Sequence, residues 1–264
     1  MKGILDFARY KRERRPITMV TSYDAWSARI AAEAGIDCVL VGDSVAMTVH
    51  GFEDTLHATT EMMVAHTAAV RRGASKLFVV ADMPFLTYRK GIAHAVDVAG
   101  ELMRAGGASA VKLEGVRGHE DVIEAIVGSG IPVMGHLGLT PQSVHQLGGY
   151  RVQGRSSEEA QRIFDEARAL ERLGCFAIVL ECVPEQLAAE ITEALAIPTI
   201  GIGSGGGTSG QVLVLHDLLG LNPDFRPRFA RKYLDGYETI RDALARYVED
   251  VRGARFPARE EILC

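Results

Sequence analysis

The sequence predicts an α/β fold, a closed (β/α)8 (TIM) barrel with an additional N-terminal helix, formed as a single domain over residues 1–264. Short Val- and Ile-rich runs alternate with Ala-, Glu- and Arg-rich segments of helical period, and eight such runs occur along 264 residues. Strands that are separated by helices form parallel sheets with right-handed crossovers. Eight such units in this length favour a closed barrel, with an open doubly wound sheet as the alternative.

The expected elements follow from local patterns. Three segments have a helical period and are followed by a glycine, which suits the left-handed cap of a helix end. They span residues 26–34, 60–72 and 157–173, followed by Gly35, Gly73 and Gly174. A first helix is expected to end in the basic run 11–15, and residues 229–252 are expected to form the last helix. The expected strands are residues 17–22, 38–41, 77–80, 110–113, 132–134, 177–180, 198–202 and 211–215.

Composition excludes several classes of function. The formal net charge is −5, so no global positive field favours nucleic acid or anionic lipid. The basic run 11–15 is short and isolated, and is typical of a solvated helix end. We find no apolar stretch of the kind that begins a signal peptide, and none near the ~18 residues of a membrane span. The four cysteines lack CxxC spacing, which fits reduced thiols in a cytoplasmic protein.

The stretch "SAVKLEG" (109–115) is an apolar strand that contains two charges. Lys112 and Glu114 are two positions apart, so they project from the same face of a strand, opposite Val111 and Leu113. Burying charges is costly unless something pairs with them. They are therefore either a mutually satisfied pair or part of a site.

Ionisable residues recur at the C-terminal ends of five expected strands. Each one has an ordinary structural explanation, such as a helix cap or a surface ion pair. Their recurrence favours a site, because the C-terminal ends of barrel strands meet at one rim, where the enzymes of this architecture have their active sites. The residues are Asp43, Asp82, Lys112, Glu114, His136 and Glu181.

This set of side chains indicates a type of chemistry. Asp43, Asp82 and Glu114 offer hard carboxylate oxygens, which suit Mg²⁺ or Mn²⁺ rather than structural zinc. Lys112 is placed to hold an anionic substrate oxygen, with a Schiff-base lysine as the less favoured alternative. Glu181 is the candidate general base, and His136 is the alternative. Together they favour proton abstraction beside a carbonyl group.

Six blocks of the chain, in order, carry a family resemblance. They are "LVGDSVAMTVHG" (40–51), "ADMPF" (81–85), "VKLEG" (111–115), "GHLGLTPQSVHQLGGYRVQGR" (135–155), "LECVP" (180–184) and "GIGSGGGTSGQVLVLHD" (201–217). Together they resemble the 3-methyl-2-oxobutanoate hydroxymethyltransferase family, also called ketopantoate hydroxymethyltransferase, which acts in pantothenate biosynthesis. The resemblance runs over almost the whole chain.

The resemblance implies a fold, an activity and residue roles. It implies a (β/α)8 barrel in a homo-oligomer, usually a decamer, that uses Mg²⁺ and 5,10-methylenetetrahydrofolate to hydroxymethylate 3-methyl-2-oxobutanoate, giving 2-dehydropantoate. By resemblance, the metal positions are Asp43, Asp82 and Glu114, and Glu181 is the catalytic base. The keto acid contacts fall on Asp43, Ser44, Asp82 and Lys112, and His136 lines the pocket.

Two other functions remain as alternatives. A Mg²⁺-dependent carbon–carbon lyase or phosphonomutase would also use carboxylates on such a barrel, but would want a catalytic Cys or Lys on a lid. A barrel that only binds a ligand is less favoured, because Glu181 is costly to bury and useless for binding alone. The glycine run 201–210 lacks the lysine of a phosphate loop and is expected to let the backbone approach a flat cofactor.

Overall fold

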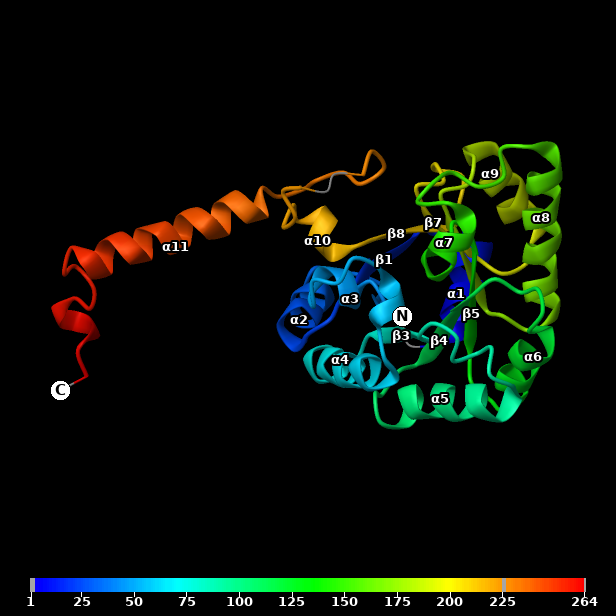
Figure 1. Ribbon diagram of the computed structural model, residues 1–264, viewed down its shortest axis with the longest axis horizontal. Helices are drawn as coiled ribbons and strands as arrows, with labels where there is room; N and C mark the ends of the chain where they lie inside the picture. The colour runs from blue at the N-terminus through cyan, green and yellow to red at the C-terminus, as the bar shows by residue number, and fades with distance from the viewer. Residues whose placement is uncertain (1–2, 225–226, 264) are drawn as a thin grey trace. The chain divides into compact units, whose positions relative to one another are not determined.

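The computed structural model describes residues 3–224 and 227–263 and contains a closed barrel of eight parallel strands (Figure 1). Every strand pairs in parallel with the next one in the chain, and β8 pairs with β1. The closed barrel is therefore confirmed over the open sheet. The strands are β1 Ile17–Thr21, β2 Cys38–Val41, β3 Phe78–Asp82, β4 Ala110–Glu114, β5 Val133–Gly138, β6 Ala177–Glu181, β7 Thr199–Ile202 and β8 Gly210–Leu213.

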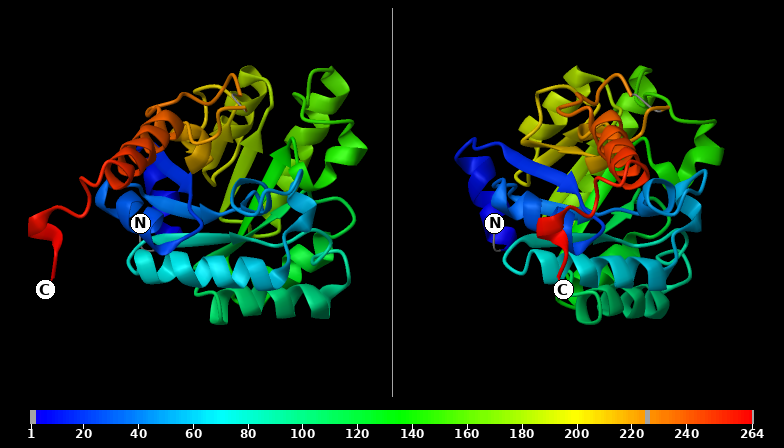
Figure 2. Two further views of the ribbon diagram at one scale, coloured as in Figure 1. Left: turned by 60° about the vertical axis from the view of Figure 1, so that its left-hand side comes forward. Right: turned by 90° about the vertical axis from the view of Figure 1, so that its left-hand side faces the viewer.

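Helices connect most of the strands and cover the outside of the barrel; α4 and α5, for example, run beside one another along the sheet (Figure 2). The helices are α1 Ile4–Arg12, α2 Ala25–Glu33, α3 Val45–Thr48, α4 Thr60–Gly73, α5 Ile92–Arg104, α6 Glu120–Gly128, α7 Val144–Leu147, α8 Ser157–Arg172, α9 Glu185–Ala194, α10 Leu215–Leu218 and α11 Gly236–Arg252. Short 3-10 turns are η1 Thr55–His57, η2 Pro141–Ser143 and η3 Arg259–Glu261. Each of these described helices is too short or too polar to cross a lipid bilayer.

The additional N-terminal helix is confirmed, and it closes one end of the barrel. Phe7 of α1 is fully buried, and its ring lies 5.2 Å from that of Phe78 and 4.9 Å from that of Phe176. Phe78 begins β3 and Phe176 directly precedes β6, so these contacts are at the N-terminal ends of the strands. Edge-to-face aromatic packing of this kind fills the bottom of the barrel core. The C-terminal rim is left for the polar side chains.

Two local expectations need correction. The helix α4 does not end in a left-handed glycine: Gly73 is its last residue, and a Cβ there would lie 2.0 Å from the carbonyl oxygen of Ala25. Glycine is required at this position by close helix packing, whereas Gly35 and Gly174 do adopt positive φ. The last helix, α11, begins at Gly236 rather than at residue 229.

The chain divides into two compact units, residues 1–213 and 214–264. The first unit contains the whole barrel, and the second contains α10 and α11. The single domain over residues 1–264 stays a prediction. Within the second unit, α11 exposes apolar side chains at helical spacing, all at least 39% exposed: Tyr237, Ile240, Leu244, Tyr247, Val248 and Val251.

Candidate active site

Lys112 and Glu114 lie on the inward face of β4, as the alternation of the strand predicts. The same face carries Ala110, which belongs to the barrel core. Both charged residues are buried, with 4% and 3% exposure. The register of the barrel sets Asp82 beside Lys112 and His136 beside Glu114. The two charges are therefore part of a wider polar cluster at the C-terminal rim.

Lys112 is paired with an aspartate of the neighbouring strand. Its Nζ lies 3.1 Å from Oδ1 of Asp82, while Oδ2 of Asp82 accepts a hydrogen bond of 3.0 Å from the backbone N–H of Asp43. Burial acts to lower the pKa of Lys112, but the surrounding carboxylates outweigh it and raise the pKa. Lys112 is therefore a cation at neutral pH, as the proposed contact with an anionic substrate requires.

His136 lies between two glutamates. Its Nδ1 is 3.4 Å from Oε1 of Glu114, and its Nε2 is 3.2 Å from Oε2 of Glu181. Lys112 Nζ also lies 3.2 Å from Nδ1. Burial and the charge of Lys112 lower the pKa of His136, but its hydrogen bonds to Glu114 and Glu181 outweigh them and raise it. The imidazole thus connects the strand ends of β4, β5 and β6.

The two aspartates repel one another. Burial, followed by the charges of Asp82 and Glu114, raises the pKa of Asp43 well above its usual range. Burial also raises the pKa of Asp82, although Lys112 and the backbone N–H of Asp43 oppose it. Three buried carboxylates thus face Lys112 and, when protonated, His136. With all three carboxylates ionised, the cluster would carry excess negative charge, and this repulsion is what raises the pKa of Asp43 beyond the effect of burial.

Ser44 and Glu181 lie at the edges of the cluster. The hydroxyl of Ser44 is 2.8 Å from the phenol oxygen of Tyr23, which is buried beneath it. The side chain of Glu181 is 17% exposed, against 3% for His136 and for Glu114. Of these three side chains, Glu181 is therefore the most accessible from the rim. The structure brings all seven residues singled out from the sequence to this one region.

Gln142 is a residue of this cluster that the sequence did not reveal. It lies in η2, after β5, and is 5% exposed. Its side-chain Nε2 donates to Oδ2 of Asp43, and its backbone N–H donates to Oε2 of Glu114, at 2.8 and 3.0 Å. A buried glutamine in a loop has no periodic signature. Thr140 and Pro141 before it are typical of a helix start and give no sign of a buried site.

The glycine run packs against protein. A Cβ at Gly205 would lie 2.3 Å from the side chain of Glu185, and one at Gly207 would lie 2.7 Å from that of Ala189. Both neighbours belong to α9. These close approaches account for the two glycines without a cofactor, and the approach of a flat cofactor to this loop stays a prediction.

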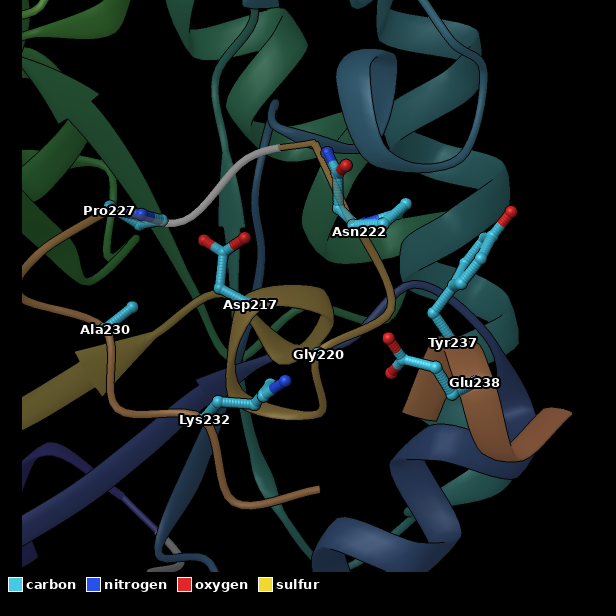
Figure 3. A pocket seen from close by; sticks show the side chains of 9 residues that line it. Asp217, Gly220, Asn222, Pro227, Ala230, Lys232, Tyr237 and Glu238 are labelled. Carbon is cyan, nitrogen blue, oxygen red and sulfur yellow. The ribbon is translucent and has the colours of Figure 1, made fainter. Parts of the chain in front are cut away.

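Two hollows are lined by residues outside the cluster. One has a volume of about 80 Å³ in the second unit and is lined by side chains that include Asp217, Lys232 and Glu238 (Figure 3). The other has about 340 Å³ and lies beside Lys11 and Arg14 of the basic run, together with Thr192. Small-molecule sites usually have roughly 300–1,000 Å³. The first is too small for such a ligand, and burial raises the pKa of its Asp217 to about 6.

The donor set at the rim fits a hard divalent cation. Within residues 3–224 and 227–263, no group of three or more His, Cys, Asp or Glu side chains is arranged to hold a metal ion. Asp43 and Asp82 are nevertheless adjacent, carry carboxylate oxygens and raise one another's energy when charged. Mg²⁺ commonly takes one or two carboxylates and keeps several waters. A cation held by this pair would offset the excess negative charge.

Fold and site together define a barrel enzyme whose acid–base and cationic groups meet at the C-terminal rim. Residues 2–259 match the model of the family described as ketopantoate hydroxymethyltransferase. The chain is 53% identical over 258 residues to 3-methyl-2-oxobutanoate hydroxymethyltransferase of Legionella pneumophila (strain Lens), covering 97% of this chain and 98% of the relative. It is 55% identical to the Thermotoga neapolitana protein of the same name, covering 94% and 92%. The chain belongs to the ketopantoate hydroxymethyltransferase family, and is a transferase.

Solved structures of other enzymes share the fold. A phosphonopyruvate hydrolase bound to oxalate and Mg²⁺ aligns with a TM-score of 0.68 at 13% identity, covering 100% of this chain and 94% of that one. A 2,3-dimethylmalate lyase of the PEP mutase/isocitrate lyase superfamily aligns with a TM-score of 0.61 at 18% identity, covering 100% and 92%. At such identities the likeness shows the fold alone. The lyase or phosphonomutase alternative is not favoured, because the chain matches the hydroxymethyltransferase family over nearly its whole length.

Proposed function

We propose that this chain transfers a hydroxymethyl group from 5,10-methylenetetrahydrofolate to 3-methyl-2-oxobutanoate, giving 2-dehydropantoate in the first step of pantothenate biosynthesis. The reaction breaks the C3–H bond of the keto acid and forms a bond from C3 to the folate's methylene carbon. One water supplies the hydroxyl oxygen, and tetrahydrofolate leaves. The observation that supports it most is the contact of Glu181 with His136 beside the Lys112–Asp82 pair, in a chain of this family.

The keto acid is proposed to bind at the rim near Lys112. The carboxylate of the keto acid is an anion, and its keto oxygen gains negative charge when C3 loses a proton. The ammonium group of Lys112 stays protonated and offers N–H donors to these oxygens. Ser44 and the carboxylates of Asp43 and Asp82 complete the proposed contacts. Burial makes each of these interactions stronger than it would be in water.

Mg²⁺ is the proposed metal, held by Asp43 and Asp82, with Glu114 completing the set directly or through water. A cation held there would supply Lewis-acid stabilisation of the negative charge that develops on the keto acid when C3 loses its proton. Hydrogen bonds and an ion pair within the chain hold these carboxylates at the rim. Removal of Mg²⁺ by a chelator is expected to abolish the reaction and to leave the barrel folded.

Glu181 is the proposed base. It is accessible from the rim, and its carboxylate lies 3.2 Å from Nε2 of His136, which is placed to orient it. A positioned base contributes roughly 10²–10⁴-fold to a rate. His136 is proposed to hold the keto acid or the product hydroxyl by a hydrogen bond, and it is the second candidate for the base.

The chain is proposed to act in the cytoplasm as a homo-oligomer, a decamer by family resemblance. The apolar stripe of α11, which includes Ile240 and Leu244, supports self-association, because large exposed apolar patches mark interaction sites. The proposed binding partners of the protein are small molecules, the keto acid and the folate, and we propose no binding to nucleic acid or to a membrane.

One incubation tests the function. The purified chain is mixed with 3-methyl-2-oxobutanoate, Mg²⁺ and 5,10-methylenetetrahydrofolate, and the formation of 2-dehydropantoate is followed by NMR. Parallel incubations without folate, and with a phosphonate substrate in place of the keto acid, separate this reaction from lyase or phosphonomutase chemistry. A chain that consumes the phosphonate and forms no 2-dehydropantoate would refute the proposal.

A further inference from the structure

Gln142 makes hydrogen bonds to groups at the ends of several barrel strands. The side-chain Nε2 donates to Oδ2 of Asp43 at 2.8 Å and to the carbonyl oxygen of Met83 at 3.0 Å. Its backbone N–H donates to Oε2 of Glu114 at 3.0 Å. Asp43 follows β2, Met83 follows β3, Glu114 ends β4 and Gln142 follows β5. One residue thus ties together the C-terminal ends of four successive strands.

Tyr88 holds the oxygen of the Gln142 amide. Its hydroxyl donates a hydrogen bond of 2.7 Å to Oε1 of Gln142, and the ring is 3% exposed. With Oε1 directed at this donor, the amide nitrogen must face the two acceptors, Asp43 and Met83. A reversed amide would set its oxygen against the carboxylate of Asp43 and the carbonyl oxygen of Met83, which can only accept hydrogen bonds.

We propose that Gln142 is a positioning residue that holds the carboxylate of Asp43 in its place for cation and keto acid binding, and that Tyr88 acts only through Gln142. The inference rests on the proposed function for the role of Asp43. It follows from geometry, because Asp43 lies just past the end of β2 and its Oδ2 accepts a hydrogen bond from the buried amide of Gln142. The amide of Gln142 is a fixed, neutral donor, and its hydrogen bond keeps the Asp43 carboxylate from turning out of the site.

The two connections of Gln142 can be separated by substitution. Its contact with Glu114 uses the backbone N–H, which any residue but proline retains. Gln142→Met keeps the length of the side chain and removes only the contacts with Asp43, Met83 and Tyr88. Tyr88→Phe removes the hydroxyl and keeps the ring. A matched control is Gln153→Met, since Gln153 is also buried and its amide donates to the carbonyl of Arg151.

Binding of Mn²⁺ to the full chain, measured by the EPR signal of the free ion, gives a readout independent of activity. Hydrogen bonds to charged groups contribute roughly 1.5–3 kcal/mol, so Gln142→Met should weaken Mn²⁺ binding about 10- to 100-fold and raise the KM for the keto acid. Tyr88→Phe should have a smaller effect in the same direction. The double variant should bind no more weakly than Gln142→Met alone, because Tyr88 acts through Gln142. Gln153→Met should bind as the wild type does.

Each outcome decides between explanations. Wild-type Mn²⁺ affinity in a folded Gln142→Met, with only a lower melting temperature, would mean that Gln142 is structural and the inference is wrong. Additive losses in the double variant would show that Tyr88 acts independently. If Gln142→Met does not fold, Tyr88→Phe decides, and an unchanged affinity there overturns the inference. A wild type that binds Mn²⁺ but leaves 3-methyl-2-oxobutanoate unchanged refutes the proposed function and leaves the Mn²⁺ comparison valid.

Discussion

The imidazole of His136 contacts the carboxylate of Glu181 across neighbouring strands, with 3.2 Å between Nε2 and Oε2. The register pairs Glu181 with Gly138, two positions beyond His136, so the histidine ring reaches forward along the rim to meet the glutamate. The same ring contacts Glu114 through Nδ1, and with a proton on Nε2 it faces the Glu181 carboxylate as a donor that orients it. This relationship favours Glu181 over His136 as the base.

Replacing the proposed base should slow deprotonation without preventing binding. Glu181→Gln is expected to lower the rate of exchange of the C3 proton of 3-methyl-2-oxobutanoate about 10²–10⁴-fold. NMR in deuterated water with Mg²⁺ and no folate isolates this step. The control is Glu190→Gln, an exposed glutamate on α9, which should exchange normally. Normal exchange in Glu181→Gln, together with its loss in His136→Gln, would assign the role to the histidine.

The positions of the charged residues could be predicted because they depend on local pattern. Each follows or ends an apolar run, and parallel strands bring such positions to one rim. β5 extends to Gly138, so His136 lies within the strand rather than after it, but still on the inward face. The period-two alternation predicts which face of a strand a residue lies on, but it does not predict where the strand ends.

Contacts between loops could not be predicted in this way. Gln142 follows β5 and reaches Asp43, which follows β2 and lies 99 residues earlier in the chain, and no periodicity links them. Gly73 resembled a helix cap, but the cause of the glycine is the backbone of Ala25 in another helix. Both features arise from tertiary packing, which appears only once the barrel is closed.

Lys112 should bind the substrate without forming an imine. Borohydride added with 3-methyl-2-oxobutanoate is expected to leave no covalent adduct, as mass spectrometry can check. Lys112→Met removes one partner of a buried ion pair and should lower the free energy of unfolding by roughly 3–5 kcal/mol, measured in urea. Lys90→Met, at an exposed position, is the control. An adduct mapped to Lys112 would contradict the proposed mechanism.

Stability should fall on acidification through His119. This residue is buried, and burial together with the charge of Arg89 lowers its pKa to about 4. In the unfolded chain the ordinary value is about 6.5, so the unfolded state binds more protons between these values. The contribution of His119 is therefore complete above pH 6.5 and is lost as pH falls toward 4.

Comparing two variants isolates this effect. His119→Phe cannot titrate, so its free energy of unfolding should decline less between pH 7 and pH 4 than that of the wild type, by roughly 2 kcal/mol. His94→Phe, at an exposed position on α5, should follow the wild type. If the free energy of unfolding of His119→Phe declines with pH as steeply as that of the wild type, His119 binds its proton as readily in the folded chain as in the unfolded chain, which contradicts the prediction.

Disrupting the apolar stripe of α11 should reduce the mass of the oligomer. Leu244 is 60% exposed and lies in the stripe that runs from Tyr237 to Val251. In a self-associated state this stripe would be buried, where a charge is costly. Leu244→Glu is therefore expected to yield smaller species by light scattering coupled to size exclusion. Ala245→Glu makes the same change of charge beside the stripe and should retain the wild-type mass, expected to correspond to ten copies. If Leu244→Glu and the wild type have the same mass at micromolar concentration, α11 does not hold the copies together.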